Sequence, residues 1–368
     1  MNSIERLRAT YSFETVDHLY RTDFYIWSEA LERWKSEGMP QGAEANDLFG
    51  YDQQVKVSAN LSGWCEPPFV PATEEIVLES GDDYDIVRDN AGRTLKCFKG
   101  RRHGFMPTYL KHAVTCRKDW EENVSPLLSP ETPERLRMIR ERAQVLAGAH
   151  SEGLWLVQNI IGGYMYLRAL VGPVEICYMV VDDPDLVHSM MRRWFELADS
   201  ISKELQRHVE FDELFLGEDI CYNHGLLISP EMVREFLFPY YRRLKENMQA
   251  RQKRRLFFHI DTDGNVNEAL PLYRREIGVD AMSPFEIAAG NDVLSIAREH
   301  PDLVISGGID KRVLAAGPPE IDAYLEGLIP AMVARGGYIP TCDHGVPDNV
   351  SFESYMHYRK RMMDLDHL

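Results

Sequence analysis

The chain has 368 residues, of which 44% are hydrophobic and 27% are charged, a composition that allows a large buried core. Its net charge of −17 argues against a nucleic-acid-binding surface, because phosphate contacts need clustered lysine and arginine. No uninterrupted apolar run approaches about 18 residues, and the amino terminus lacks the pattern of a signal peptide. We therefore expect a cytoplasmic enzyme that binds neither nucleic acid nor a membrane.

The first half of the chain shows a weak alternation of strand and helix patterns. Residues 1–53 are expected to form a helical extension. Two strands are expected at 54–58 and 154–158, and two long helices at 133–149 and 183–210. Residues 84–98 combine two alternating segments with the turn cluster Asp-Asn-Ala-Gly, which predicts a β-hairpin inserted over the fold.

The second half repeats a short apolar strand, a polar or glycine-rich turn and a helix. Five strands are predicted at 213–217, 256–259, 279–282, 303–306 and 338–341. Helices are predicted between them at 230–253, 265–277, 293–300 and 320–335. Strands that alternate with helices are typical of parallel βα units. The sequence therefore predicts one α/β domain over residues 1–368, a TIM-type (β/α)₈ barrel with an inserted hairpin and extra N-terminal helices.

Polar side chains follow every strand of the second half. The active site of such a barrel lies at the carboxyl ends of its strands, so these residues are the first candidates for chemistry. In chain order they are Glu218 and Asp219; His259, Asp261 and Asp263; Ser283 and Glu286, in Ser283-Pro284-Phe285-Glu286; Asp310 and Lys311, after Gly307-Gly308-Ile309; and Cys342, Asp343 and His344.

The His259-Ile260-Asp261 segment is the first candidate for a metal site. A spacing of two places both side chains on one face of an extended strand. Imidazole, carboxylate and thiolate all bind zinc, and a catalytic zinc typically has three protein ligands. His259, Asp261 and Cys342 fit that count, with Glu218 as a substitute or additional ligand. The alternative is a hydrogen-bonded strand end, with Cys342 as one of six widely spaced cysteines that pack in the core.

Two further pairs are candidates for proton transfer. Adjacent acids raise one another's pKa, so Glu218 or Asp219 could orient or protonate a substrate, although neighbouring strand residues point to opposite faces. An imidazole held by a carboxylate is an acid–base unit, which Asp343-His344 would supply unless it only supports other residues.

Two double glycines accompany these residues. Gly307-Gly308 allows close backbone approach or a tight turn, but no Gly-x-Gly-x-x-Gly opens a helix, so no dinucleotide site is predicted. Gly162-Gly163 precedes Tyr164, which either lines the mouth of the site or packs in the core, and packing is favoured for the glycines.

Several short segments resemble the uroporphyrinogen decarboxylase superfamily, and within it the branch of corrinoid-dependent methyltransferases. The resemblance runs from about Tyr84 to the carboxyl terminus. Its segments are Gly163-Tyr164, Leu170-Val171-Gly172, Gly217-Glu218-Asp219-Ile220-Cys221-Tyr222, Ile228-Ser229-Pro230-Glu231-Met232, Phe238-Pro239-Tyr240-Tyr241, His259-Ile260-Asp261, Gly307-Gly308-Ile309-Asp310-Lys311 and Gly336-Gly337-Tyr338-Ile339-Pro340. They are specific for the superfamily and less specific for the reaction.

The resemblance implies a zinc ion bound by a His-x-Cys pair and a cysteine near the carboxyl terminus. It also implies methyl transfer to or from a corrinoid (methylcobalamin) carried by a separate protein. His259 and Cys342 match this pattern, whereas Asp261 stands where the first cysteine would be. A carboxylate is a harder ligand than a thiolate, so we expect Zn²⁺ here to act as a Lewis acid on an ether oxygen at least as readily as on a thiol.

The haem-pathway decarboxylases resemble this chain less closely. They carry an Arg-Gln-Ala-Gly-Arg segment near the amino terminus that holds substrate carboxylates, and no such segment is present here. The nearest basic cluster downstream is Arg101-Arg102-His103.

The favoured function is a zinc-dependent methyltransferase that moves a methyl group between a small substrate, a methoxylated compound or a thiol, and a corrinoid protein. Catalysis is assigned to Glu218, Asp219 and His344; substrate binding to Tyr164, Tyr222, Asp310 and Asp343; and the metal to His259, Asp261 and Cys342. The alternative is a metal-independent decarboxylase of a carboxylated substrate, with Asp219 or Asp261 stabilising a protonated intermediate and Arg101 or Arg102 binding carboxylates. A barrel that only binds a ligand is the third hypothesis, and a homodimer is compatible with the sequence.

Overall fold

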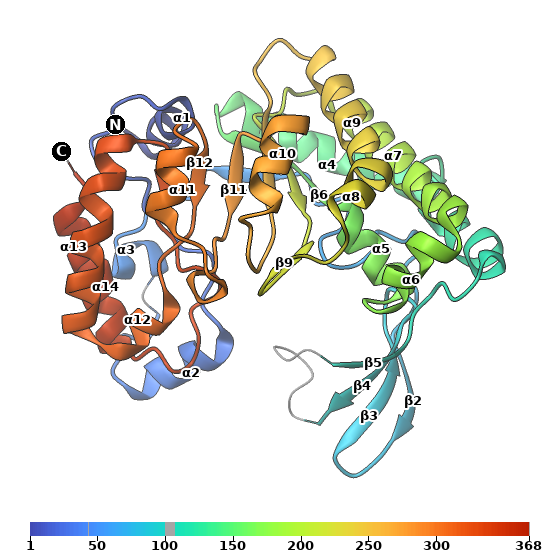
Figure 1. Ribbon diagram of the computed structural model, residues 1–368, viewed down its shortest axis with the longest axis horizontal. Helices are drawn as coiled ribbons and strands as arrows, with labels where there is room; N and C mark the ends of the chain where they lie inside the picture. The colour runs from blue at the N-terminus through green and yellow to red at the C-terminus, as the bar shows by residue number, and fades with distance from the viewer. Residues whose placement is uncertain (43, 100–106, 368) are drawn as a thin grey trace. The chain divides into compact units, whose positions relative to one another are not determined.

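The structure is a computed structural model that describes residues 1–42, 44–99 and 107–367 (Figure 1). Arg101, Arg102 and His103, the basic cluster of the decarboxylase alternative, lie outside the described residues. The chain forms two compact units. The central unit comprises Lys56–Ile220 and Leu227–Phe258, and the terminal unit comprises Met1–Val55, Cys221–Leu226 and His259–Leu368. The prediction of one continuous domain over residues 1–368 stays a prediction.

Parallel strands form the core of the central unit. β1 (Lys56–Ser58), β6 (Trp155–Ile161) and β7 (Glu213–Gly217) pair in that order, and β10 (Phe257–Asp261) begins beside β7. All seven residues of β6 are buried. Because both faces of the strand are covered, its residues are apolar except for Gln158 and Asn159. The helix α4 (Pro133–Ser151) packs on β6, and α7 (Pro184–Leu205) packs on α4.

The remaining helices of the central unit follow the strands of this sheet. They are α5 (Gly163–Val171), α6 (Glu175–Asp182), α8 (Pro230–Phe236) and α9 (Phe238–Ala250), with the short η1 (Asp119–Val124) and η2 (Ser125–Leu128) before α4. The predicted helix 230–253 is two helices that meet at Leu237, which ends α8 and precedes α9. Pro239 lies in the first turn of α9, where its missing N–H and its ring interrupt a continuous helix.

A separate antiparallel sheet also belongs to the central unit (Figure 1). Its strands are β2 (Ile76–Ser80), β3 (Tyr84–Arg88), β4 (Thr94–Phe98) and β5 (Thr108–Lys111), paired in that order. Residues 84–98 thus form β3 and β4, and two further strands flank them. In the turn, one carboxylate oxygen of Asp89 accepts hydrogen bonds from the backbone N–H groups of Ala91 and Arg93, at 3.0 and 2.8 Å.

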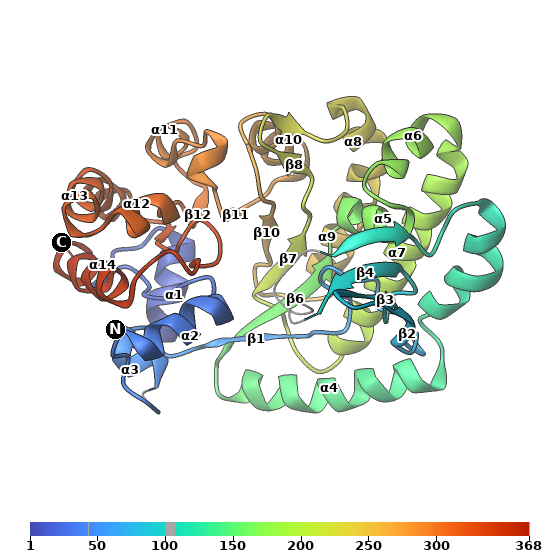
Figure 2. The same ribbon diagram turned by 90° about the horizontal axis from the view of Figure 1, so that it is seen from below.

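The terminal unit has parallel strands of its own, beginning with the last residues of β10 (Figure 2). β11 (Ala281–Ser283), β12 (Val304–Ser306) and β13 (Tyr338–Ile339) follow in order, and each pair is parallel. Helices α10 (Ala269–Ile277), α11 (Val293–Glu299), α12 (Lys311–Ala316), α13 (Pro318–Arg335) and α14 (Phe352–Leu365) lie between and after the strands. The predicted parallel α/β fold is confirmed, with a strand found at each of the seven predicted places.

The amino-terminal segment of the terminal unit contains α1 (Ser3–Ser12), α2 (Ser28–Ser36) and α3 (Ala45–Phe49). Asn2 caps α1 in a capping box with Glu5. After α1 the chain forms an isolated bridge between Ile26 and Val346, which brings the amino-terminal segment beside the loop that follows β13.

No single helix among the described residues is long and apolar enough to cross a membrane. The helices α5 and α6 are long and apolar enough only when they are taken together, and a bend of 102° separates them.

Candidate active site

The carboxyl end of β10 holds a buried network of three side chains. His259 and Asp261 lie in the strand itself, where the prediction had β10 end at His259. As the spacing of two predicts, both side chains reach one partner, the hydroxyl of Ser283. His259 Nε2 lies 2.9 Å from Ser283 Oγ, and Ser283 Oγ donates a short hydrogen bond to Asp261 Oδ2. The register of the sheet, with Asp261 opposite Ser283, creates this arrangement.

The amino-terminal segment adds a fourth group to this network. The Tyr11 hydroxyl lies 3.5 Å from His259 Nδ1. Because Ser283 donates its own hydrogen to Asp261, its oxygen is free to accept from His259 Nε2, which assigns the hydrogen of a neutral imidazole to Nε2. Tyr11 then donates to Nδ1. Tyr11, His259 and Ser283 thus each donate a hydrogen bond to the next group, and the series ends at the Asp261 carboxylate.

Cys342, the third predicted metal ligand, lies in the loop after β13. Its side chain is buried, and its backbone forms an isolated bridge with Ile309. Its backbone N–H donates to Asp23 Oδ1 at 2.7 Å. Burial raises the pKa of the Cys342 thiol, and the carboxylates of Asp23 and Asp343 raise it further. In the protein without a bound metal ion, these surroundings therefore favour the neutral thiol of Cys342 over its thiolate.

The three predicted donors suit zinc by their chemistry, since imidazole nitrogen, carboxylate oxygen and thiolate sulfur all bind this ion. The positions of these three side chains, however, do not suit a zinc ion. Within residues 1–42, 44–99 and 107–367, no group of three or more His, Cys, Asp or Glu side chains lies close enough to hold a metal ion. The structure brings His259 and Asp261 together through Ser283 and does not group Cys342 with them.

His344 lies two residues beyond Cys342 in a cluster of aromatic side chains. Its Nδ1 is 3.3 Å from the Tyr25 hydroxyl, and its Nε2 is 3.5 Å from Asp263 Oδ2. The rings of Phe24, Tyr25 and Trp27 lie within 5.5 to 6.5 Å of the imidazole, measured between ring centroids. The hydrogen bond to Asp263 raises the pKa of His344. The carboxylate partner of His344 is thus Asp263, where the sequence had suggested Asp343.

Asp343 and Asp310 form hydrogen bonds that shape the backbone. Asp343 is fully buried, and its two oxygens accept from the backbone N–H groups of Ile287 and Lys311, at 2.9 and 3.2 Å. Burial raises the pKa of Asp343. Asp310 caps α12 and forms an ion pair with Arg312. Both predicted substrate-binding residues therefore already have protein partners.

The Gly307-Gly308 pair has the conformation that the sequence suggested. Its φ angles are 121° and 77°, in the region that favours glycine. A Cβ atom at Gly307 would lie 1.9 Å from the carbonyl oxygen of Pro284. This turn needs glycine because two loops of the terminal unit approach each other at backbone distance.

In the central unit, Glu218 is fully buried at the end of β7. Tyr241 in α9 donates to Glu218 Oε2 at 2.5 Å and accepts from the Gly163 N–H at 2.6 Å. A Cβ atom at Gly162 would lie 2.1 Å from Glu218 Oε2. Close packing explains the Gly162-Gly163 pair, the alternative that the sequence favoured.

Asp219 differs from its neighbour Glu218. Its φ of 51° is unusual for a residue other than glycine, although aspartate tolerates it better than most. Arg168 in α5 donates to Asp219 Oδ2 at 2.6 Å, and both side chains are about one quarter to one third exposed. As the sequence suggested for adjacent acids, the two point to different surroundings, and only Asp219 is reached by solvent.

Tyr164 and Tyr222, the remaining predicted binding residues, lie in different surroundings. Tyr164 in α5 is buried, and its hydroxyl has no hydrogen-bond partner among the described residues. Tyr222 in β8 (Cys221–Tyr222) is 46% exposed and pairs with Gly225 of β9 (Gly225–Leu226).

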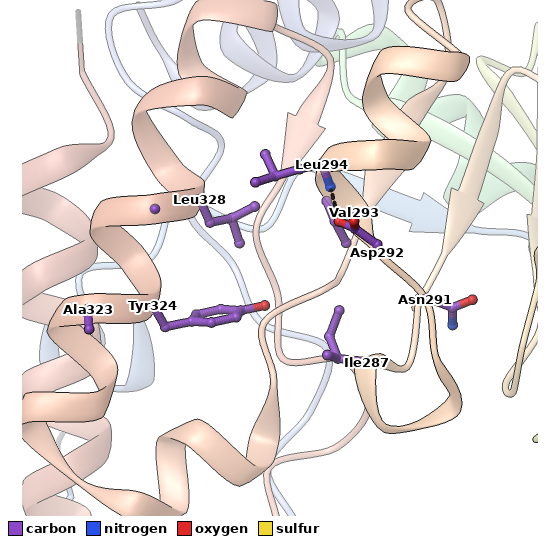
Figure 3. A pocket seen from close by; sticks show the side chains of 9 residues that line it. Ile287, Asn291, Asp292, Val293, Leu294, Ala323, Tyr324 and Leu328 are labelled. Atoms are coloured by element: carbon purple, nitrogen blue, oxygen red, sulfur yellow. Dashed lines mark hydrogen bonds between the residues drawn. The ribbon is translucent and has the colours of Figure 1, made fainter.

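A cavity of about 410 Å³ in the terminal unit lies between α11 and α13 (Figure 3). Tyr324 and Leu328 of α13 point toward Val293 and Leu294 of α11 across it. Its polar side chains are already engaged, since Asn291 bonds backbone groups and Tyr324 donates to the Gly308 carbonyl at 2.6 Å. None of the predicted site residues lines this cavity, so we place the candidate site at the strand ends instead.

Sequence reasoning missed the partners that give these residues their surroundings. They are Tyr11, Arg168 and Tyr241. Ser283 and Asp263 were recognised at their strand ends, but their pairing with His259, Asp261 and His344 was not. Tyr241 stands within a resemblance segment, Tyr11 lies in the predicted helical extension, and Arg168 lies outside every predicted element.

The chain was also compared with known proteins. A family model described as uroporphyrinogen decarboxylase (URO-D) matches residues 102–363. Among solved structures, a methyltransferase from Methanosarcina mazei is similar over 99% of both chains, with a TM-score of 0.60 and 14% identity. At this identity the likeness shows the fold alone.

Other similarities are weaker. A putative vitamin-B12 independent methionine synthase from Listeria monocytogenes has a TM-score of 0.42 and 10% identity, over 95% of this chain and 97% of that one. The score is too low to support an argument. The comparison with curated proteins gave no match. Because the URO-D model spans more than half of the chain, this protein belongs to the uroporphyrinogen decarboxylase (URO-D) family.

Proposed function

We propose that this protein is a methyltransferase that moves a methyl group between a small substrate and a corrinoid carried by a partner protein. The observation that carries the proposal is the buried network in which His259 and Asp261 share the Ser283 hydroxyl at the carboxyl ends of β10 and β11. The fold shared with the Methanosarcina mazei methyltransferase along 99% of both chains supports it. We further propose that the parallel strands belong to a (β/α)₈ barrel, whose chemistry lies at these strand ends.

Zinc is part of the proposal. His259, Asp261 and Cys342 would hold it, and the ion would supply Lewis acidity toward a substrate oxygen or sulfur. The support is the donor set and the pairing of His259 with Asp261 on one face of β10. Since the three donors are not grouped, binding would require Cys342 to approach His259 and Asp261 and its thiol to lose its proton, while Ser283 would orient the other two ligands.

The chain's own residues would handle the proton of the reaction. When a methyl ether loses its methyl group, the oxygen departs as an alkoxide or phenolate and needs a proton. His344 is about one quarter exposed and is held by Asp263 and Tyr25, so its ring nitrogens are placed to exchange protons with a ligand and with solvent. Glu218, buried beneath Tyr241, would hold α9 against the end of β7.

Decarboxylation is the second candidate, and the family match together with the Arg168–Asp219 ion pair favours it. Arg168 is a cation at a strand end, and it would bind a substrate carboxylate only by exchanging its ion pair with Asp219 for one with the substrate. In this alternative Asp219 would stabilise the protonated intermediate, and Cys342 would have no role.

Replacing Cys342 with serine separates the two candidates. The measurements are bound zinc, methyl transfer to free cobalamin, and carbon dioxide release from a carboxylated substrate. The methyltransferase proposal expects wild-type protein to hold about one zinc ion and Cys342→Ser to lose the metal and about 100-fold of its rate. Full methyl-transfer activity in zinc-free protein would overturn the zinc site alone. Carbon dioxide release that Cys342→Ser leaves unchanged, without methyl transfer, would overturn the methyltransferase proposal.

A further inference from the structure

An exposed tryptophan stands next to the end of β7 in the central unit. Trp64 is 42% exposed, although tryptophan is among the most costly side chains to leave in water. One face is stacked on Phe215, with 5.2 Å between ring centroids and 16° between ring planes. A Cβ atom at Gly217 would lie 3.7 Å from the Trp64 ring, so the ring lies over the last residue of the strand.

The ion pair of Arg168 and Asp219 lies near this ring. Asp219 follows Gly217 by two residues. Next to Trp64, burial raises the pKa of the Cys65 thiol, and the charge of Asp219 raises it further while that of Arg168 lowers it. Among the described residues, one of the five N–H groups of the Arg168 guanidinium donates a hydrogen bond, the one to Asp219. The pair is partly exposed and held on a strained backbone, since Asp219 has a φ of 51°.

The charges around Trp64 indicate what kind of ligand fits. Arg168 is balanced by Asp219, and Arg93 forms ion pairs with Asp89 and Glu66. No positive charge is left over among these groups, so a second carboxylate would gain little from them. A neutral ligand with an oxygen that accepts from Arg168 fits better.

We propose that Trp64, Phe215 and the Arg168–Asp219 pair form a subsite for a neutral aromatic ring that carries an ether or hydroxyl oxygen. The ring extends the stack of Phe215 and Trp64, and the oxygen accepts from the guanidinium of Arg168. The proposal rests on the proposed function and narrows its substrate to aromatic methyl ethers.

Three neutral probes of similar size test the subsite by calorimetry or ligand-observed NMR, without metal, corrinoid or turnover. They are methoxybenzene, methoxycyclohexane, which lacks the aromatic ring, and methylbenzene, which lacks the oxygen. Wild-type protein is expected to bind methoxybenzene about two- to tenfold more tightly than methoxycyclohexane. Trp64→Leu should abolish this preference and Trp64→Phe should keep it. Tyr178→Leu, which removes another exposed aromatic side chain, 66% exposed on α6, should leave it unchanged.

The oxygen contact is tested with an arginine pair. Arg168→Lys should remove the preference for methoxybenzene over methylbenzene, whereas Arg117→Lys, which alters the exposed ion pair with Asp183, should not. Equal binding of the aromatic and non-aromatic ethers, or a ring preference that survives Trp64→Leu, overturns the subsite. Methyl transfer without ring preference overturns this inference alone, and ring preference without methyl transfer overturns the proposed function alone.

Discussion

Two groups of residues at strand ends, one in each unit, differ in how they hold their charges. In the terminal unit, His259, Ser283 and Asp261 are buried and joined by hydrogen bonds through the Ser283 hydroxyl. In the central unit, Arg168 and Asp219 form an ion pair that solvent reaches, beside the exposed Trp64. The hydrogen bonds hold the side chains of the first group in fixed positions, whereas the second group is the one for which we propose a ligand. A buried polar network is costly to break, whereas an exposed ion pair contributes little stability and is free to exchange partners.

Ser283→Ala is expected to have the largest effect, because it removes the atom that joins His259 to Asp261. We expect methyl transfer to fall by about 100-fold and the free energy of unfolding to fall by about 1–3 kcal/mol, since two buried polar groups lose a partner. Kinetics and urea unfolding measure the two quantities. Ser36→Ala, at an exposed position in α2, is the control. Activity within about twofold of wild type would show that the network has no catalytic role.

Tyr241→Phe tests whether the buried hydrogen bond between Tyr241 and Glu218 stabilises the central unit. The substitution leaves the buried Glu218 carboxylate and the Gly163 N–H without the Tyr241 hydroxyl, so the free energy of unfolding should fall by about 1–3 kcal/mol. Tyr240→Phe is the matched control, because its hydroxyl is half-buried and makes 3.3 Å contacts with His188. Equal losses for the two variants would contradict the account of Glu218 as a buried anchor.

Asp219→Asn tests the exposed ion pair of the central unit. Asparagine tolerates the positive φ of this position but gives up the charge, so stability should change by less than about 1 kcal/mol. The difference from wild type should shrink as salt is added, because salt screens exposed ion pairs. A loss as large as that of Ser283→Ala would mean that this pair is structural.

His112, stacked on Tyr109 of β5, gives the smallest expected effect and depends on pH. Burial lowers the pKa of His112 below its usual 6.5, so the folded protein binds fewer protons than the unfolded chain. This histidine therefore costs no stability above pH 6.5 and makes the protein less stable as pH falls below it. His112→Gln should lose less stability than wild type between about pH 7 and pH 5 in urea unfolding. Parallel pH curves for the two proteins would contradict the assigned direction.

The sequence predicted the parallel strands well because each is a short apolar run bounded by turn residues. The spacing of His259 and Asp261 also predicted that their side chains share one face, and both reach the Ser283 hydroxyl. The sequence predicted the ends of strands and helices less accurately. The predicted strand 256–259 continues to Asp261, and the predicted helix 230–253 is interrupted at Leu237.

The partners of the site residues could not be predicted, because sheet register and loop packing decide them. Ser283 meets Asp261 only because these two residues are opposite each other in β10 and β11. Tyr25 reaches His344 across 319 residues of chain, and Asp263, rather than the adjacent Asp343, holds the same imidazole. Periodicity records which face a residue occupies, and it contains no information about which distant side chain shares that face.

The most direct test of the proposed function is a methyl-transfer assay with reduced cobalamin and a panel of methoxylated, methylamine and thiol compounds, followed by cobalt absorbance. We expect wild-type protein to methylate the cobalamin from a methoxylated compound, and His259→Ala to lower the rate by at least about 100-fold. Unchanged cobalt absorbance with every compound of the panel, together with carbon dioxide release from a carboxylated substrate, would contradict methyl transfer and establish the decarboxylase alternative.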